Sequence, residues 1–151
     1  MKKVILASVL AMSAIGTASA REVGVTAGHD FAGIGSNMVG LTYSENFGEW
    51  SVAAGYDRNL RNGDEADRAS LVVTRNMGWN VMGFPVLPKA GGAYVNPEGV
   101  RGGHAWLVGV GTRYAFGESL TATLDYRYQV GEDDVRDWDG NQVLLGLNWK
   151  F

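Results

Sequence analysis

Apolar and polar residues alternate with a period of two along most of the chain, and most clearly at its end. One side of this last segment carries Val143, Leu145, Leu147, Trp149 and Phe151, and the other side carries mostly polar residues or glycine. Alternation of this length predicts a β-strand with one apolar and one polar face. Leu144 is the single apolar residue on the polar side.

The same alternation predicts strands in seven further segments. It is regular over 23–27, 39–43, 50–56, 106–116 and 120–130. The segment 70–75 can be assigned with either face outward, and the segment 86–95 is interrupted by Pro88. Proline cannot donate a hydrogen bond to a β-ladder, so Pro88 predicts a bulge or a strand end. Together with the last segment, the pattern predicts eight strands.

The predicted connections alternate in length, which is an independent pattern. Three are short, at 44–48, 78–84 and 117–119, and four are longer and polar, at 30–36, 58–67, 96–103 and 131–140. Eight strands then place four long loops at one end and three turns with both termini at the other. This is the layout of an all-β, antiparallel, up-and-down transmembrane β-barrel.

The first twenty residues differ from the rest of the chain. Lys2 and Lys3 form a basic start, 4–15 are mainly apolar, and 16–20 are small. This order predicts a secretory signal peptide, because the apolar part is too short for a membrane-spanning helix. The chain is therefore divided into a signal peptide, 1–20, and a single barrel domain, 21–151.

Composition removes several other classes of protein. Without 1–20 the chain loses two of its 13 basic residues and none of its 16 acidic ones, which leaves a net charge of −5 and argues against nucleic-acid binding. Cysteine is absent, so disulfides and thiolate chemistry are excluded. After residue 20 no apolar run reaches the roughly 18 to 20 residues of a transmembrane helix.

Charged residues on the polar faces indicate which side of the barrel meets lipid. Opposite charges occur on these faces, where they could pair across a narrow lumen, whereas in hydrocarbon they would be prohibitive. Aromatic residues lie towards the strand ends on the apolar faces, as expected at the two interfaces of a bilayer. The predicted ion-pair network of the lumen comprises Glu49, Asp57, Lys89, Arg113, Asp125, Arg127 and Lys150. A narrow conducting pore is the alternative for the same residues.

The chain from Glu22 to Phe151 resembles the small, eight-stranded outer-membrane β-barrel proteins of the OmpA/OmpX type. Its most specific feature is the last apolar row, Val143 to Phe151, which is similar to the carboxy-terminal signal recognised by the outer-membrane assembly machinery. The resemblance implies a place in the bacterial outer membrane, with periplasmic termini and loops outside. An unpaired strand of this kind can be bound by β-augmentation.

Candidate catalytic groups are few, and we predict no catalytic, cofactor or metal site. The two histidines, His29 and His104, lie at strand ends, and only a spatial arrangement with Ser36 or Ser70 would give a lipid-modifying enzyme. The acidic loop 132–140 lacks the spacing of a calcium-binding loop and is expected to be solvated, with Trp138 at its tip available to a partner or to lipopolysaccharide.

These expectations combine into a non-enzymatic, porin-like envelope protein that presents four extracellular loops and serves envelope integrity or adhesion. Its expected partners are outer-membrane lipid, lipopolysaccharide and the assembly machinery, with no nucleic acid and no cofactor, and the protein is expected to be a monomer. The alternatives are a lipid-modifying enzyme, a narrow pore, and a soluble periplasmic barrel that binds an apolar ligand.

Overall fold

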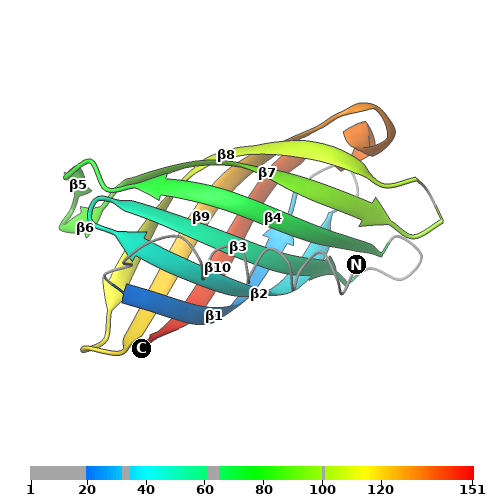
Figure 1. The fold of residues 1–151 in the computed structure, drawn as a ribbon. Helices are drawn as coiled ribbons and strands as arrows, with labels where there is room; N and C mark the ends of the chain where they lie inside the picture. The colour runs from blue at the N-terminus through cyan, green and yellow to red at the C-terminus, as the bar shows by residue number, and fades with distance from the viewer. Residues whose placement is uncertain (1–19, 32–34, 61–64, 100) are drawn as a thin grey trace.

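Eight antiparallel strands close into a barrel in the computed structural model, which describes residues 20–31, 35–60, 65–99 and 101–151 (Figure 1). The barrel strands are β1 (Ala20–Asp30), β2 (Ser36–Phe47), β3 (Trp50–Asn59), β4 (Ala66–Arg75), β7 (Leu87–Pro97), β8 (Gly103–Ala115), β9 (Leu120–Gly131) and β10 (Gly140–Lys150). Each strand pairs with its neighbour in the chain, and β10 closes the barrel by pairing with β1. The predicted fold class is therefore confirmed, whereas the predicted signal peptide falls mainly on 1–19, outside the described residues.

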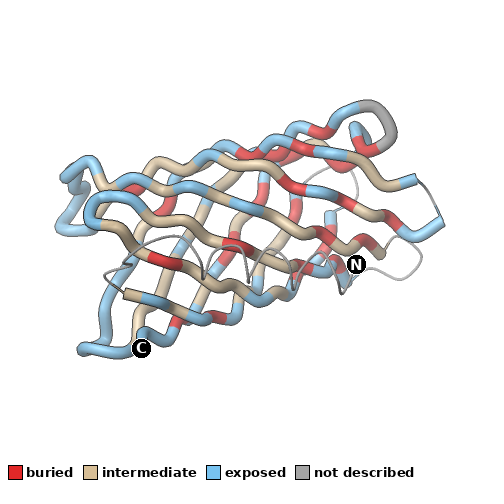
Figure 2. Tube along the Cα trace, viewed as in Figure 1, coloured by how far each residue is buried: buried red, intermediate tan, exposed pale blue. Residues whose placement is uncertain are grey.

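Alternation places apolar side chains on the outer wall along the whole circumference. Val25, Leu41, Trp106 and Leu145, for example, are 56%, 59%, 62% and 62% exposed. Buried residues alternate with them along the strands and are most frequent in the half of the barrel farthest from the carboxy terminus (Figure 2). The part of the chain described here contains no helix long and apolar enough to cross a membrane.

The two strands that the sequence left ambiguous have definite faces. In β4, Leu71 and Val73 are exposed on the outer wall, and Arg68 is buried inside. In β7, Pro88 lies at the strand end, since the ladder with β4 begins at Lys89. The expectation of a strand end at Pro88 is confirmed.

The ends of the barrel depart from the predicted connections in three places. β2 continues to Phe47, which leaves only Gly48 and Glu49 as a tight turn, with Gly48 at φ +63°. The connection from β4 to β7 contains a separate small hairpin of β5 (Asn80–Val81) and β6 (Phe84–Pro85). The acidic loop folds into a short 3-10 helix, η1 (Asp133–Trp138). We call the end with this helix the loop end and the opposite one the terminal end.

Candidate functional site

The interior of the barrel is crossed by a buried charge cluster centred on Asp57. The Asp57 carboxylate accepts hydrogen bonds from Arg68 at 3.2 Å and from Arg127 at 3.1 Å. The three residues come from β3, β4 and β9, and β3 and β9 lie on opposite sides of the closed barrel. Asp57 and Arg68 are 3% and 4% exposed. This cluster therefore reaches across the lumen from one wall of the barrel to the opposite one.

Two buried glutamines extend the cluster to further strands. Arg68 donates a hydrogen bond to the side chain of Gln129 at 2.9 Å, and Arg127 donates one to Gln142 at 2.7 Å. The Gln142 amide in turn donates to Asp30 at 2.8 Å. We refer to Asp30, Asp57, Arg68, Arg127, Gln129 and Gln142 as the interior network. Its two acids balance its two arginines, as a buried set of charges requires.

The loop end is covered by the 3-10 helix η1. Val135 and Trp138 are 0% and 8% exposed and pack with Ala66, Val95 and Ala105. The backbone carbonyl of Trp138 accepts a hydrogen bond from Gln129 at 2.9 Å, which ties this cap to the interior network. The expectation that Trp138 projects from a solvated loop is wrong, because its indole ring covers apolar surface between strands β4, β7 and β8.

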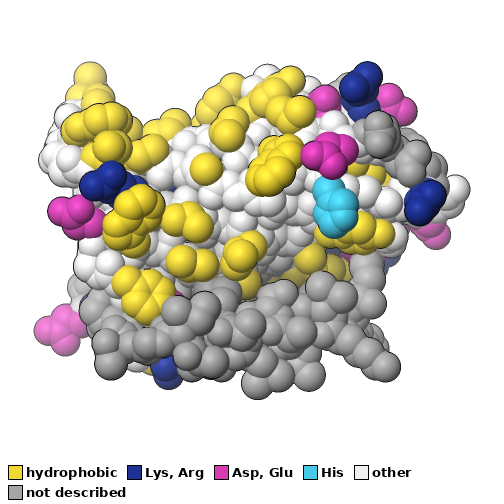
Figure 3. All heavy atoms as spheres, turned by 45° about the horizontal axis from the view of Figure 1, so that its top comes forward, with side chains coloured by type: hydrophobic (Ala, Val, Ile, Leu, Met, Phe, Trp, Pro, Cys, Tyr) yellow, Lys and Arg dark blue, Asp and Glu magenta, His cyan; other side chains and the backbone are white. Residues whose placement is uncertain are grey.

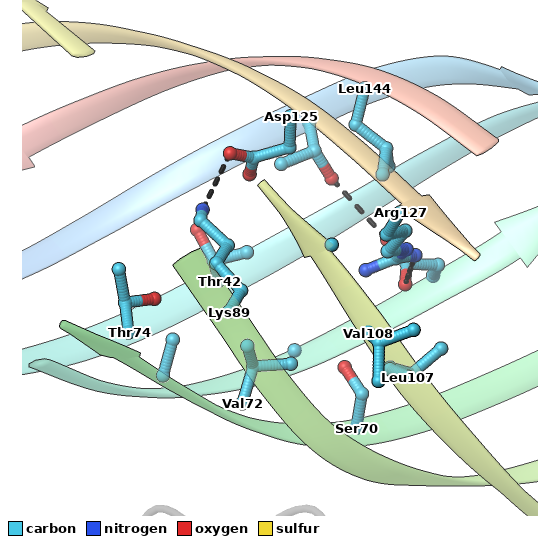
Figure 4. Close-up of a pocket in the computed structure, with 15 residues that line it drawn as sticks. Thr42, Ser70, Val72, Thr74, Lys89, Leu107, Val108, Asp125, Arg127 and Leu144 are labelled. Carbon is cyan, nitrogen blue, oxygen red and sulfur yellow. Dashed lines mark hydrogen bonds and ion pairs between the residues drawn. The ribbon is translucent and has the colours of Figure 1, made fainter. Parts of the chain in front are cut away.

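A second ion pair lies on the terminal side of the interior network. The Lys89 ammonium group is 2.5 Å from a carboxylate oxygen of Asp125, and the two side chains point towards one another in Figure 4. Gly111 lies beside them, and an added Cβ there would come within 2.8 Å of Lys89 Cε and would also collide with the Asp125 carboxylate. The absence of a side chain at Gly111 therefore gives the pair its space.

An internal cavity of about 80 Å³ separates this pair from the interior network. Its lining is mixed, with polar groups from Thr42, Ser70 and Arg127 and apolar ones from Val72 and Leu144 (Figure 4). A space of this size and polarity can hold several water molecules. Leu144, the apolar exception on the last strand, is 3% exposed and fills part of the lumen.

The predicted lumen residues divide into two groups. Asp57, Lys89, Asp125 and Arg127 are brought together inside the barrel, in the two clusters above.

The other three predicted lumen residues lie at the terminal end. Arg113 and Lys150 are exposed there, and neither has an ion-pair partner among the described residues. Glu49 is placed wrongly by the sequence analysis, because the tight turn removes it from the strand. Its side chain is 71% exposed and pairs with Arg75 at 3.9 Å.

Sequence reasoning missed four residues of the interior network, which are Arg68, the two glutamines and Asp30, the last of them assigned to the predicted loop 30–36. Arg68 follows directly on the range predicted as a loop, 58–67, although the strand begins at Ala66. Continuing the alternation of Ser70, Val72 and Thr74 two residues towards the amino terminus would have placed Arg68 inside. The glutamines lie on predicted polar faces, but a search for charged residues alone overlooks them.

The histidines and serines considered for catalysis lie on different sides of the barrel wall. His29 and His104 are on the outward face, where His29 contacts Asn37 at 3.0 Å and His104 packs against Tyr94. Ser70 lines the internal cavity, and Ser36 is buried and accepts a hydrogen bond from Asn59. Within the described ranges, no group of three or more His, Cys, Asp or Glu residues is arranged to hold a metal ion.

The last apolar row lies on the outer wall. Leu145, Leu147, Trp149 and Phe151 are all exposed, and Val143 precedes them on the same face. The strand is fully paired on both sides, with β1 and β9, and Phe151 continues the ladder by donating to the Arg21 carbonyl at 3.0 Å. The row therefore belongs to the strand that closes the barrel.

Solved structures with the same fold include outer-membrane barrels and de novo designed transmembrane β-barrels. The N-terminal β-barrel domain of Pseudomonas aeruginosa OprF matches with a TM-score of 0.72 and 17% identity, over 89% of this chain and 98% of that one. Neisserial surface protein A matches with a TM-score of 0.63 and 14% identity, over 90% and 100% of the two chains. Yersinia pestis Ail, solved in a phospholipid bilayer nanodisc, matches with a TM-score of 0.51 and 14% identity, over 86% and 99%.

Comparison of sequences places the chain in a family. No curated protein sequence matches it. The family model described as YfaZ precursor matches residues 1–133, which is most of the chain. The chain therefore belongs to the YfaZ precursor family, and its fold is the closed, eight-stranded, antiparallel β-barrel of outer-membrane proteins.

Proposed function

We propose that the protein is a sealed, non-enzymatic scaffold of the bacterial outer membrane that presents its loops at the cell surface. The observation that carries this proposal is the distribution of polarity. Apolar side chains cover the outside of the barrel, and balanced charges with paired amides fill the inside. A protein in water would gain nothing from such an arrangement, whereas hydrocarbon requires it.

The proposed orientation is supported by the two unlike ends of the barrel. Both ends of the barrel sheet, at Ala20 and Lys150, lie at the terminal end together with the short turns. Barrels of this kind have short turns on the periplasmic side and longer loops outside. We therefore place the terminal end in the periplasm and the loop end at the cell surface.

Assembly is proposed to depend on the outward row from Val143 to Phe151. The row lies on the strand that closes the barrel, so this strand stays unpaired on one side until β1 joins it. The free edge offers backbone donors and acceptors, while the alternate side chains can fill pockets of the assembly machinery.

A role in contact or envelope integrity suits the sealed interior better than transport does. The η1 cap, the interior network and the Lys89–Asp125 pair obstruct the lumen one after another. Function is then left to the loops and to the lipid-facing wall, with lipid and lipopolysaccharide as the expected contacts of a single barrel. Among the similar structures, Ail is described as an attachment invasion locus protein, which is a contact role on the same fold.

Membrane fractionation combined with gel migration before and after heating tests the proposal. We expect the protein in the outer-membrane fraction, extracted only by detergent, with a folded form that migrates differently until it is boiled. Release into the soluble fraction without detergent would overturn the proposal in favour of a soluble barrel. The lipid composition of cells that make the protein is also compared with that of cells that lack it. A difference that disappears in the double variant His29→Ala/His104→Ala would favour the enzyme instead.

A further inference from the structure

The small hairpin β5–β6 carries an exposed apolar surface that the barrel itself does not use. Trp79, Val81, Met82 and Phe84 are 56%, 61%, 95% and 48% exposed. Met82 and Gly83 form the tip and have φ values of 52° and 85°. The hairpin is nevertheless well formed, because Val81 pairs with Phe84 and the Val86 amide donates to the Trp79 carbonyl at 2.8 Å.

This connection differs from the two other turns at the same end of the barrel. From Asn76 to Pro88 the chain has no charged residue. The turn between β2 and β3 contains Glu49, and the turn between β8 and β9 contains Glu118. Turns that face water need no apolar tip, so solvent exposure does not account for the composition of this hairpin.

The hairpin lies against the outer wall of the barrel. The ring of Phe84 is 6.4 Å from that of Tyr114 on β8, and Tyr114 packs edge to face on Phe116 at 4.9 Å. Tyr114 and Phe116 are themselves exposed on the outward face. Hydrophobic side chains gather at this end of the molecule, at the left in Figure 3. The hairpin therefore continues the aromatic surface of the wall.

A basic side chain, which also pairs with Glu49 at 3.9 Å, lies at the same level. Arg75, the last residue of β4 before the hairpin, has its guanidinium group 4.9 Å from the ring centre of the exposed Trp50. Aromatic rings beside a basic group are typical of the boundary between lipid headgroups and acyl chains. The aromatic surface and Arg75 thus both indicate the boundary between lipid headgroups and acyl chains.

We propose that the β5–β6 hairpin is a lipid anchor, which inserts its apolar tip into the headgroup and acyl boundary of the leaflet at the terminal end. The inference rests on the proposed function, since it requires the barrel to span a bilayer. Apolar and aromatic side chains bind this zone by removing their surface from water. Because the hairpin occurs on one side of the barrel only, it would fix the depth and the tilt of the barrel in the membrane.

The natural chain has no cysteine, so single cysteines can report the depth of chosen positions. Met82→Cys places a solvent-sensitive fluorophore at the hairpin tip. Ser119→Cys is the matched control in another turn at the same end, and Val108→Cys, in the middle of the lipid-facing β8, is the control for hydrocarbon. Each protein is reconstituted in phosphatidylcholine vesicles, with iodide on both sides as the aqueous quencher or with brominated acyl chains as the lipid quencher.

The label at position 82 is expected to lose fluorescence to brominated lipid, to be less accessible to iodide than the label at 119, and to emit at a wavelength between those of the labels at 119 and 108. The label at 119 is expected to be quenched by iodide. A label at 82 that behaves like the one at 119, while 108 reports lipid, would overturn the anchor and leave the membrane barrel intact. Iodide quenching at 108 would instead overturn the proposed function itself.

Discussion

Asp57 is the residue on which the interior charges converge. Its carboxylate binds Arg68 and Arg127, and both arginines are held deep in the lumen. The variant Asp57→Asn keeps the shape of the side chain but leaves two buried guanidinium groups without their shared negative charge. We expect a loss of about 3 to 5 kcal/mol in the free energy of unfolding, because breaking a buried pair leaves an uncompensated charge. This loss of stability is measured by urea unfolding of the protein in vesicles, followed by tryptophan fluorescence.

Glu49→Gln is the matched control for this prediction. Glu49 forms its ion pair with Arg75 at the surface, at 3.9 Å, so its removal is expected to change stability by less than about 1 kcal/mol. Equal effects of the two substitutions would show that the Asp57 cluster contributes no more than a surface pair.

Gly111 allows a second residue-scale prediction, which concerns space and not charge. The variant Gly111→Ala adds a methyl group within 2.8 Å of Lys89 Cε and against Asp125, so the ion pair must shift. We expect a cost of about 1 to 3 kcal/mol, as for other overpacked interiors. Gly92→Ala on β7 is the control, since its Cβ would meet only the Ala105 carbonyl, at 3.9 Å. If Gly92→Ala destabilises as much under the same urea unfolding, the effect comes from the loss of glycine in a strand and not from the pair.

At the scale of the elements, the strand β10 permits a test of its proposed role in assembly. Phe151 and Phe116 are both exposed aromatic residues at the terminal end, 68% and 58% exposed, but only Phe151 belongs to the outward row of β10. We expect Phe151→Ala to lower the amount of folded protein in the outer membrane several-fold and Phe116→Ala to leave it nearly unchanged. Heat-modifiable migration of the membrane fraction provides the measurement, and equal losses would reduce Phe151 to an ordinary lipid-facing ring.

Most barrel strands could be predicted from the sequence because alternation is a local property. Trp106 to Phe116 and Leu120 to Val130 have the predicted outward face along their length. The two-residue turn at Gly48 could not be placed, because polar residues continue the strand to Phe47. The hairpin β5–β6 could not be predicted either, since two strands of two residues each are too short to show a periodic pattern.

The candidate site was predictable only in part, and for a related reason. Alternation shows that Asp125 and Arg127 face inward, but it does not show which residues meet across the lumen. The contact between Asp57 and Arg127 joins opposite walls of the barrel, so it depends on closure and strand stagger. Trp138 is buried only because η1 folds over neighbouring strands, and no local pattern predicts this cover.

For the molecule as a whole, the obstructions along the lumen predict that the barrel does not conduct ions. The interior of an eight-stranded barrel is just wide enough to be filled by side chains. Here the cap around Trp138, the interior network and the Lys89–Asp125 pair lie in series along the lumen, so a conducting path would have to pass all three. The purified protein in planar bilayers is therefore expected to show no stepwise current, with a water-filled porin as the positive control. The variant Trp138→Ala removes only the cap, so it is also expected to show no current. Discrete conductance steps in the unmodified protein would contradict the sealed scaffold and favour a pore.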